Sequence, residues 1–410
     1  MESYNSRAGR TVPQGSGYLA FVPATLPPEP TIQFDSELIR LLSDADIALG
    51  RLSGIADVLP NPDLFVAMYV RKEAVLSSQI EGIQCTLDEV LEYENGSSVV
   101  QSKDIGEVVN YVDAMNYGIA RLAEFPLSLR LIREIHGRLM SGVRGEHKAP
   151  GEFRRTQNWI GPQGSTLATA AFVPPPVPDM TEALSNLEAF IHDRSSLPLS
   201  IQCAIAHLQF ETIHPFLDGN GRVGRLLVSL MLHQRGALMR PLLYISHYLK
   251  ANRLEYYDRL TDVRKTGNWE GWIKFFLKGV AVVGHEAAAT AKHIVEFRDE
   301  AKRRANEIGR TEFAMIDHLF ERPIIDARAA EQKLGVTFAT ANTCLNNLVA
   351  AGLIRETTGK KRGRIFRFDA YLDLFDDPIP APVQIYDSSE DEEENHYRHG
   401  AATKLHKESK

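Results

Sequence analysis

Residues 208–235 read LQFETIHPFLDGNGRVGRLLVSLMLHQR, and this stretch decides the fold. Upstream of its polar centre, apolar residues recur at the spacing of one helix face, at Ile201, Ala204, Ile205 and Leu208. Downstream, the same spacing resumes and stops at Gly236, with Val223, Leu226, Leu227, Leu230 and Met231. We therefore expect two buried helices that are joined by a short polar loop.

The loop between these helices has the composition of a polyphosphate site. Gly219 and Gly221 can adopt backbone angles that turn consecutive N–H groups inward. The helix that follows adds its unpaired N–H groups and the positive end of its dipole. Arg222 and Arg225 are three residues apart, so both can reach phosphate oxygens from one helix face.

Two further residues of the loop supply chemistry. Asp218 offers a hard oxygen ligand, which suits Mg²⁺ better than Zn²⁺. His214 is the group there with an ordinary pKa near neutrality, so it is the natural proton acceptor. Together the loop residues predict that a nucleophile on a partner is activated beside a bound nucleotide.

The segment HPFLDGNGRVGR, residues 214–225, resembles the signature of Fic-domain proteins, HPF-x-(D/E)-G-N-G-R-x-x-R, with every fixed position filled. The resemblance implies a Fic-type helical core that transfers AMP from ATP to a Ser, Thr or Tyr hydroxyl of a target protein. It also implies that His214 is the general base, that Asp218 holds Mg²⁺ and that Phe216 anchors the loop. The nucleotide-binding residues that it implies are Glu81, His214, Gly219, Asn220, Gly221, Arg222, Val223, Gly224, Arg225, Tyr256 and Tyr257. Of the tyrosines, one can equally be a core residue.

A second segment, SSQIEG at residues 77–82, is similar to the inhibitory motif (S/T)-x-x-x-E-(G/N) of Fic proteins. The chain predicts a helix over about residues 62–82, which starts at Asn61-Pro62 and ends at Gly82. Glu81 in its last turn is disfavoured by the helix dipole, so a cation should lie nearby. In the family this glutamate pairs with the second arginine of the signature, here Arg225. We expect Ser77, Glu81 and Gly82 to form an inhibitory element on the same chain.

A hairpin is predicted between the two motifs, from Gln157 to Val173. In Fic proteins a hairpin at this point, the flap, docks the target segment by strand addition. Its residues here are Trp159, Ile160, Gly161, Phe172 and Val173.

The last folded segment, from Thr311 to about Phe375, resembles a winged helix-turn-helix. Its helix over Thr340–Ala351 stands in the recognition position, and the basic hairpin around GKKRG at residues 359–363 is the wing. That helix carries no Arg or Lys to read guanine, so DNA and a protein are both open as its partner.

Composition sets the remaining limits. The 410 residues are 44% hydrophobic and 24% charged, which is typical of globular proteins, and the net charge of −7 gives no global nucleic-acid signature. No apolar run is long enough for a membrane span, and the N-terminal stretch lacks a secretory apolar region. Three scattered cysteines indicate reduced thiols and a cytoplasmic location.

The expected fold is mainly α, with a Fic-type helical core, a β-hairpin flap, an N-terminal helical lobe and a C-terminal winged helix-turn-helix. The expected segments are an irregular arm (1–30), the N-terminal lobe (31–125), the Fic domain (126–280), a linker helix (281–310), the winged helix (311–376) and an acidic disordered tail (377–410). Four alternatives stay open: another nucleotide, another transferred group, removal of AMP from a target, and a DNA-binding regulator that senses nucleotide. Self-modification, a homodimer and the identity of the target also stay open.

Overall fold

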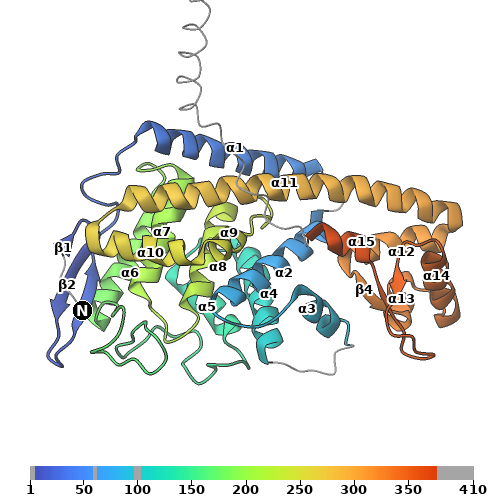
Figure 1. The fold of residues 1–410 in the computed structure, drawn as a ribbon, viewed down its shortest axis with the longest axis horizontal. Helices are drawn as coiled ribbons and strands as arrows, with labels where there is room; N and C mark the ends of the chain where they lie inside the picture. The colour runs from blue at the N-terminus through green and yellow to red at the C-terminus, as the bar shows by residue number, and fades with distance from the viewer. Residues whose placement is uncertain (1–4, 59–61, 97–102, 376–410) are drawn as a thin grey trace, which may run out of the picture. The chain divides into compact units, whose positions relative to one another are not determined.

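The computed structural model describes residues 5–58, 62–96 and 103–375. As the sequence predicts, the described chain is mainly helical, with two small antiparallel sheets (Figure 1). Within it, no helix combines the length and the apolar content that crossing a membrane requires. The first helices are α1 (Ser36–Val58), α2 (Pro62–Ile80), α3 (Leu87–Glu94), α4 (Lys103–Leu122) and α5 (Leu129–Leu139). The N-cap predicted at Asn61 and the acidic tail lie outside the described residues.

The N-terminal segment forms a sheet, so the prediction of an irregular arm is wrong there. Its strands are β1 (Asn5–Ser6), β2 (Gly9–Pro13) and β3 (Leu19–Pro23), and β2 pairs antiparallel with both neighbours. Tertiary contacts hold this sheet in place: Phe21 is fully buried, and its N–H donates to the carbonyl of Val173 at 2.9 Å. The local sequence pattern carries no signal for such a contact.

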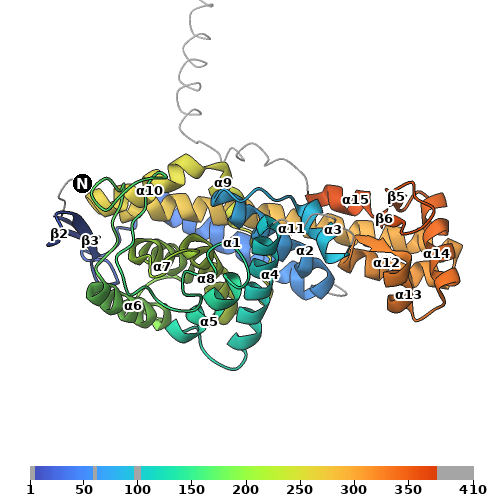
Figure 2. The same cartoon turned by 90° about the horizontal axis from the view of Figure 1, so that it is seen from below.

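The central helices place the predicted loop. They are α6 (Val177–His192), α7 (Leu199–Ile213), α8 (Asn220–Gln234), α9 (Ser246–Ala251), α10 (Arg253–Thr266) and α11 (Trp269–Ile308). Helices α7 and α8 pack together as expected, and α8 also contacts α2, α4 and α5 (Figure 2). Helix α7 is buried along its whole length except at its first residue.

Helix α11 is one continuous helix of 40 residues. The expected boundary between the Fic domain and the linker helix, at residue 280, therefore falls inside this helix. The glycines inside α11 allow neighbouring elements to approach it closely. A Cβ at Gly284 would lie 2.9 Å from the Cβ of Ala48 on α1, and α1 runs beside α11 (Figure 1).

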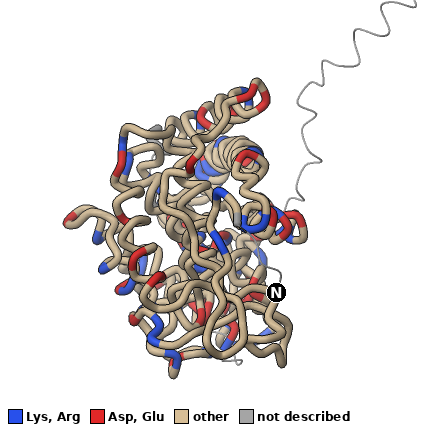
Figure 3. The backbone as a smooth tube through the Cα atoms, turned by 90° about the vertical axis from the view of Figure 1, so that its left-hand side faces the viewer, with Lys and Arg blue, Asp and Glu red and all other residues tan. Residues whose placement is uncertain are grey.

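The C-terminal elements are α12 (Arg310–Glu321), β4 (Ile324–Asp326), α13 (Ala327–Leu334), α14 (Phe338–Ala350), β5 (Arg355–Glu356), β6 (Ile365–Arg367), α15 (Asp369–Leu372) and the 3₁₀ turn η1 (Asp373–Phe375). The strands form an antiparallel sheet in the order β4-β6-β5. Arg367 in this segment forms an ion pair with Asp88 of α3 at 2.8 Å. Along the described chain acidic and basic residues are interspersed, as Figure 3 shows for one side.

Candidate active site

The polar loop turns between two residues with left-handed backbone angles. His214 follows the last residue of α7 with φ 49° and ψ 60°, and Gly219 precedes α8 with φ 76°. A left-handed histidine is uncommon, so neighbouring groups must hold it there. The loop therefore presents the imidazole of His214 and the N-terminus of α8 on one short segment.

Side-chain amides fix the backbone of this loop. Asn158 donates from Nδ2 to the carbonyls of His214 and Phe216, at 3.1 and 2.9 Å. The side chain of Asn220 accepts from the N–H of Phe216 and donates to its carbonyl, each at 2.8 Å. Asn220 is 2% exposed, so its side chain braces the loop, and only its backbone remains for the predicted phosphate cradle.

Two buried residues that the sequence did not reveal complete this support. Arg154 donates from Nε to the carbonyl of His214 at 3.1 Å and from Nη2 to the carbonyl of Pro175 at 2.5 Å. The ring of His136 stacks on Phe216 with centroids 3.7 Å apart, and its Nε2 lies 3.1 Å from the carbonyl of Asp218. The sequence pattern does not show which carbonyls these two residues reach.

The environment of His214 favours the neutral imidazole. Burial lowers the pKa of His214 to about 4, and the nearby positive charge of Arg264 acts in the same direction. Glu81 opposes this effect only in part. At neutral pH the ring is therefore uncharged and can accept a proton.

The expected pair between the N-terminal motif and the signature is present. Arg225 donates from Nη2 to Oε1 of Glu81 at 2.8 Å, and from Nε to Oγ of Ser77 at 2.7 Å. The guanidinium is 1% exposed. Burial alone would raise the pKa of Glu81, but Arg225, assisted by Arg222 and His214, holds it below its ordinary value. Helix α2 ends at Ile80, so Glu81 lies just beyond its last turn and not within it as predicted, and Gly82 follows with φ 85°.

The Glu81 carboxylate also lies at the start of α8. A side chain at Gly221 would collide with Oε1 of Glu81, so this oxygen fills the space that the glycine leaves open. The first turn of a helix is where unpaired N–H groups bind anions. Glu81 thus lies beside the turn where the sequence predicts phosphate.

The first arginine of the signature has a different partner from the one predicted. Arg222 is 3% exposed and donates from Nη1 to Oε2 of Glu107 at 2.7 Å. Glu107 lies on α4 and was not predicted from the sequence. The guanidinium of Arg222 is therefore paired with Glu107 in this structure, and the phosphate contact implied for it stays a prediction.

Three more residues of the predicted nucleotide set belong to the core. Val223 is 2% exposed, and Gly224 packs against α7, where a Cβ would lie 2.7 Å from Oε1 of Glu211. Tyr256 is 1% exposed, and its hydroxyl lies 2.9 Å from Nε2 of His207. Tyr257 is 40% exposed, so it is the tyrosine of the pair that remains accessible to a ligand.

The predicted hairpin is reduced to a single bridge, between Ile160 and Phe172. The intervening segment, GPQGSTLATAA, contains Gly, Pro and small polar residues, which disfavour a regular strand pair. Phe172 and Val173 are buried, and the carbonyl of Val173 already accepts from β3. Trp159 is 43% exposed, so the side of the bridge that carries Trp159, Ile160 and Gly161 is the accessible one.

Asp218 fits a magnesium ion that is shared with ligand phosphates. Its side chain is 34% exposed, and Oδ2 lies 3.4 Å from Nζ of Lys148. Magnesium commonly takes one or two protein carboxylates and completes its shell with phosphates and water. Within residues 5–58, 62–96 and 103–375 no group of three or more His, Cys, Asp or Glu side chains could hold a metal ion.

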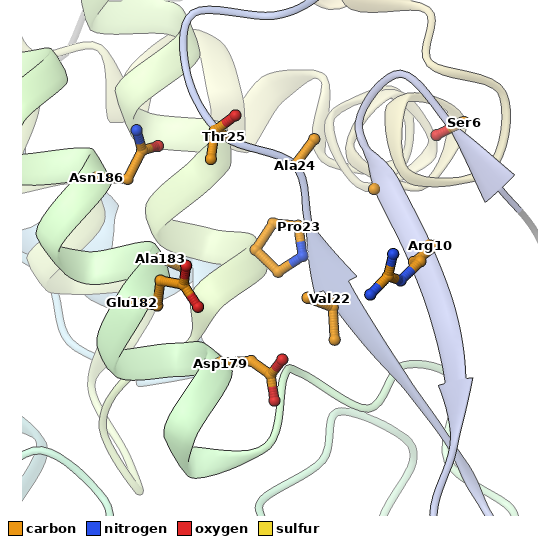
Figure 4. Close-up of a pocket in the computed structure, with 11 residues that line it drawn as sticks. Ser6, Arg10, Val22, Pro23, Ala24, Thr25, Asp179, Glu182, Ala183 and Asn186 are labelled. Carbon is orange, nitrogen blue, oxygen red and sulfur yellow. The ribbon is translucent and has the colours of Figure 1, made fainter.

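A separate cavity of about 370 Å³ lies between strands β2 and β3 and helix α6 (Figure 4). Arg10 lines one side of it, and Asp179 and Glu182 line the other. It contains none of the predicted site residues.

Comparison with known proteins agrees with this geometry. Residues 39–120 match the segment described as Fic/DOC family N-terminal, and residues 126–232 match the Fic/DOC family. Similar curated proteins include the protein adenylyltransferase Fic of Drosophila grimshawi, 32% identical over 208 residues that cover 49% of this chain and 38% of that protein. The corresponding protein of Culex quinquefasciatus is 31% identical over 204 residues, which cover 48% of this chain and 37% of that protein. The chain therefore spans less than half the length of these relatives.

The fold has a solved counterpart. A Fic family protein from Desulfovibrio desulfuricans G20 superposes with a TM-score of 0.54 at 20% identity, covering 82% of this chain and 97% of that one. At this identity the likeness concerns the fold alone. The chain thus contains a segment of the Fic/DOC family N-terminal type and a Fic/DOC family segment, and the signature at residues 214–225 lies in the second.

Proposed function

We propose that this protein transfers AMP from ATP to a Ser, Thr or Tyr hydroxyl of a target protein. The observation that carries the proposal is the short loop that joins the imidazole of His214 to the N-terminus of α8, and burial, which lowers the pKa of His214, supports it. The hydroxyl oxygen forms a bond to the α-phosphorus, the bond from that phosphorus to the bridging oxygen breaks, and pyrophosphate leaves. His214 takes the hydroxyl proton.

The backbone of Gly219, Asn220 and Gly221 holds the phosphates in this proposal, and the accessible ring of Tyr257 offers a surface for the base. Magnesium bound to Asp218 would neutralise phosphate charge. The exposed side of the bridge at Trp159, Ile160 and Gly161 is where we place the target segment.

We propose further that α2 restrains the reaction. Glu81 binds Arg225 and occupies the start of α8, so ATP phosphates and this carboxylate compete for the same groups. Ser77 supports the restraint by holding Arg225 through its hydroxyl and its carbonyl. Release of Glu81 is then a condition of activity.

Labelled ATP tests the transfer. We expect the Glu81→Gly variant to incorporate α-phosphate label into protein, and His214→Ala in that background to abolish it. His293→Ala, an exposed histidine on α11, is the matched control and should have no effect. Label transfer that persists without His214 would refute its role as the base.

The same assay separates the alternatives. If more label is incorporated from GTP, UTP or CTP than from ATP, the protein prefers that nucleotide. If a pre-labelled target loses AMP, the protein removes AMP from its target. Mass spectrometry of the Glu81→Gly variant after incubation with ATP identifies self-modification, and light scattering identifies a homodimer. We also propose a cytoplasmic location, since Cys85, Cys203 and Cys344 are all free and buried.

A second function, DNA binding by the C-terminal segment as a winged helix, is favoured by one local observation. Lys360, Lys361 and Arg362 are three consecutive exposed cations. They line a cavity of about 870 Å³ together with Asn342 of α14. Arg364 ties the hairpin to α14, since it donates to Oδ1 of Asn342 at 2.6 Å.

Salt dependence of DNA binding tests this function. Each phosphate contact contributes roughly 0.9 to the slope of log affinity against log salt, so replacing Lys360, Lys361 and Arg362 by Ala should lower the slope by about 3. The matched control replaces the exposed cations Arg40, Lys265 and Lys278 by Ala and should leave the slope unchanged. Equal slopes for both triple variants would refute the surface.

A further inference from the structure

Glu211 is a buried carboxylate that the proposed reaction does not use. It lies on α7, three residues before His214, and is 7% exposed. Its Oε1 has no hydrogen-bond partner among the residues that the structure describes. A buried polar atom without a partner is unfavourable, so its position calls for a physical reason.

Two glycines of α8 place Glu211 and Glu81 over the same helix face. A Cβ at Gly224 would lie 2.7 Å from Oε1 of Glu211, and a Cβ at Gly221 would collide with Oε1 of Glu81. These glycines are three residues apart and therefore face the same side of the helix. The Nη1 of Arg225 lies 3.0 Å from the same Cβ position at Gly221. Glu81 contacts the Arg225 guanidinium directly, and Glu211 interacts with it electrostatically.

Charged and titratable groups surround Glu211 on α7, α8 and α10 and just beyond the end of α2. Arg225 on α8 and Arg264 on α10 are positive, and Glu81 beyond the end of α2 is negative. Arg264 also donates from Nη2 to the backbone carbonyl of Glu211 at 3.3 Å. On α7, the Nδ1 of His207 lies 3.4 Å from the Cβ position at Gly224.

Burial raises the pKa of Glu211 to about 7, and the negative charge of Glu81 acts in the same direction. Arg225 and Arg264 oppose this rise. The Tyr256 hydroxyl nearby stays neutral, because burial raises its pKa well above the ordinary value. While Glu81 is bound, the two carboxylates therefore compete for the charge of Arg225.

We propose that Glu211 is a positioning residue that serves as the counter-charge of Arg225 after Glu81 has left the nucleotide site. A buried guanidinium without any counter-charge is strongly unfavourable. Because the Glu211 carboxylate stays near Arg225 when Glu81 leaves, it lowers the free-energy cost of releasing Glu81. When Glu81 withdraws, its repulsion of Glu211 ends, and the Glu211 carboxyl gives its proton to solvent. The inference rests on the proposed restraint by Glu81.

A double-mutant cycle of thermal unfolding measurements tests whether Glu211 replaces Glu81 as the counter-charge of Arg225. It is measured at about pH 8, where Glu211 is largely ionised. In the otherwise unchanged protein, Glu211→Gln removes a like charge, so we expect Tm to stay the same or rise. In the Glu81→Gly background the same change removes the negative charge of Glu211 from Arg225, so Tm should fall by at least about 3 °C. An equal change of Tm in both backgrounds would show a merely structural role and overturn the proposal.

A third background separates the loss of charge in Glu211→Gln from any disturbance of packing by the new glutamine side chain. Adding Arg225→Met to Glu81→Gly removes the charge that Glu211 is proposed to neutralise, so Glu211→Gln should then no longer lower Tm. A fall of the same size there would also overturn the proposal. Glu296→Gln, an exposed residue of α11, is the control and should leave Tm unchanged in every background. Because the cycle measures unfolding, it stands even if labelled ATP gives no transfer.

Discussion

At the scale of single residues, Arg225 organises the site. It is buried, it binds Glu81 and both the hydroxyl and the carbonyl of Ser77, and Glu211 lies over the same face of its helix. The guanidinium is buried but the Glu81 side chain is 34% exposed, so solvent weakens this ion pair relative to a fully buried one. The pair was predicted from the resemblance of the two motifs to those of Fic proteins, since the short N-terminal motif gains weight only beside the signature.

His214 yields a prediction at this same scale. Its folded pKa is about 4, below the ordinary value of 6.5, so the neutral form persists until the pH falls towards 4. We expect its ring signals in an NMR titration, assigned by comparison with His214→Ala, to stay constant between about pH 5.5 and 8. A titration midpoint near 6.5 would contradict the burial that lowers the pKa.

At the scale of elements, helix α8 depends on close approach by its neighbours. Gly224 allows α7 to pack so closely that a Cβ would lie 2.7 Å from Oε1 of Glu211 and 3.3 Å from Cδ1 of Phe210. A glycine inside a helix ordinarily reduces stability, by roughly 0.5–1 kcal/mol relative to alanine. Packing must therefore outweigh propensity at this position.

Gly224→Ala tests that packing. We expect it to destabilise the protein by about 1–3 kcal/mol, measured by urea unfolding, because the added methyl forces α7 and α8 apart. Gly50→Ala on the exposed face of α1, where no atom lies within 4 Å, is the matched control. It should raise stability by up to about 1 kcal/mol. If both variants gained stability, the close packing at Gly224 would be refuted.

Elements also differ in how well the sequence predicts them. The loop and its two helices followed from apolar spacing and a dense motif, and α2 begins at Pro62 as its start signal indicates. The N-terminal sheet and the single bridge at Ile160 depend on tertiary hydrogen bonds, which local patterns do not encode. For the same reason Arg154, Asn158 and Glu107 could not be assigned to the site, although each donates to the loop or pairs with α8.

At the scale of the described molecule, the C-terminal segment holds the inhibitory helix. The Nζ of Lys72 on α2 donates to the carbonyl of Phe375 at 2.8 Å, and the ring of Tyr69 meets Phe375 edge to face with centroids 5.5 Å apart. Helix α12 also packs against α2. Motion of the C-terminal segment would therefore be transmitted to the helix that ends just before Glu81.

Phe375→Ala tests this connection. Removing the buried ring should loosen α2, so label incorporation from ATP should rise several-fold in the otherwise unchanged protein and stay constant in the Glu81→Gly background. Phe338→Ala, which removes an exposed ring on α14, is the control. If label incorporation rose equally in the otherwise unchanged protein and in the Glu81→Gly variant, Phe375 would not act through Glu81.

The central claim is that one anion site at the start of α8 serves both Glu81 and ATP, with His214 as the base. The most direct test is incorporation of α-phosphate label into protein by four chains: unchanged, Glu81→Gly, His214→Ala and the double variant. We predict strong incorporation by Glu81→Gly, little by the unchanged chain, and none by either chain that lacks His214. Equal incorporation by Glu81→Gly and the double variant would contradict the claim.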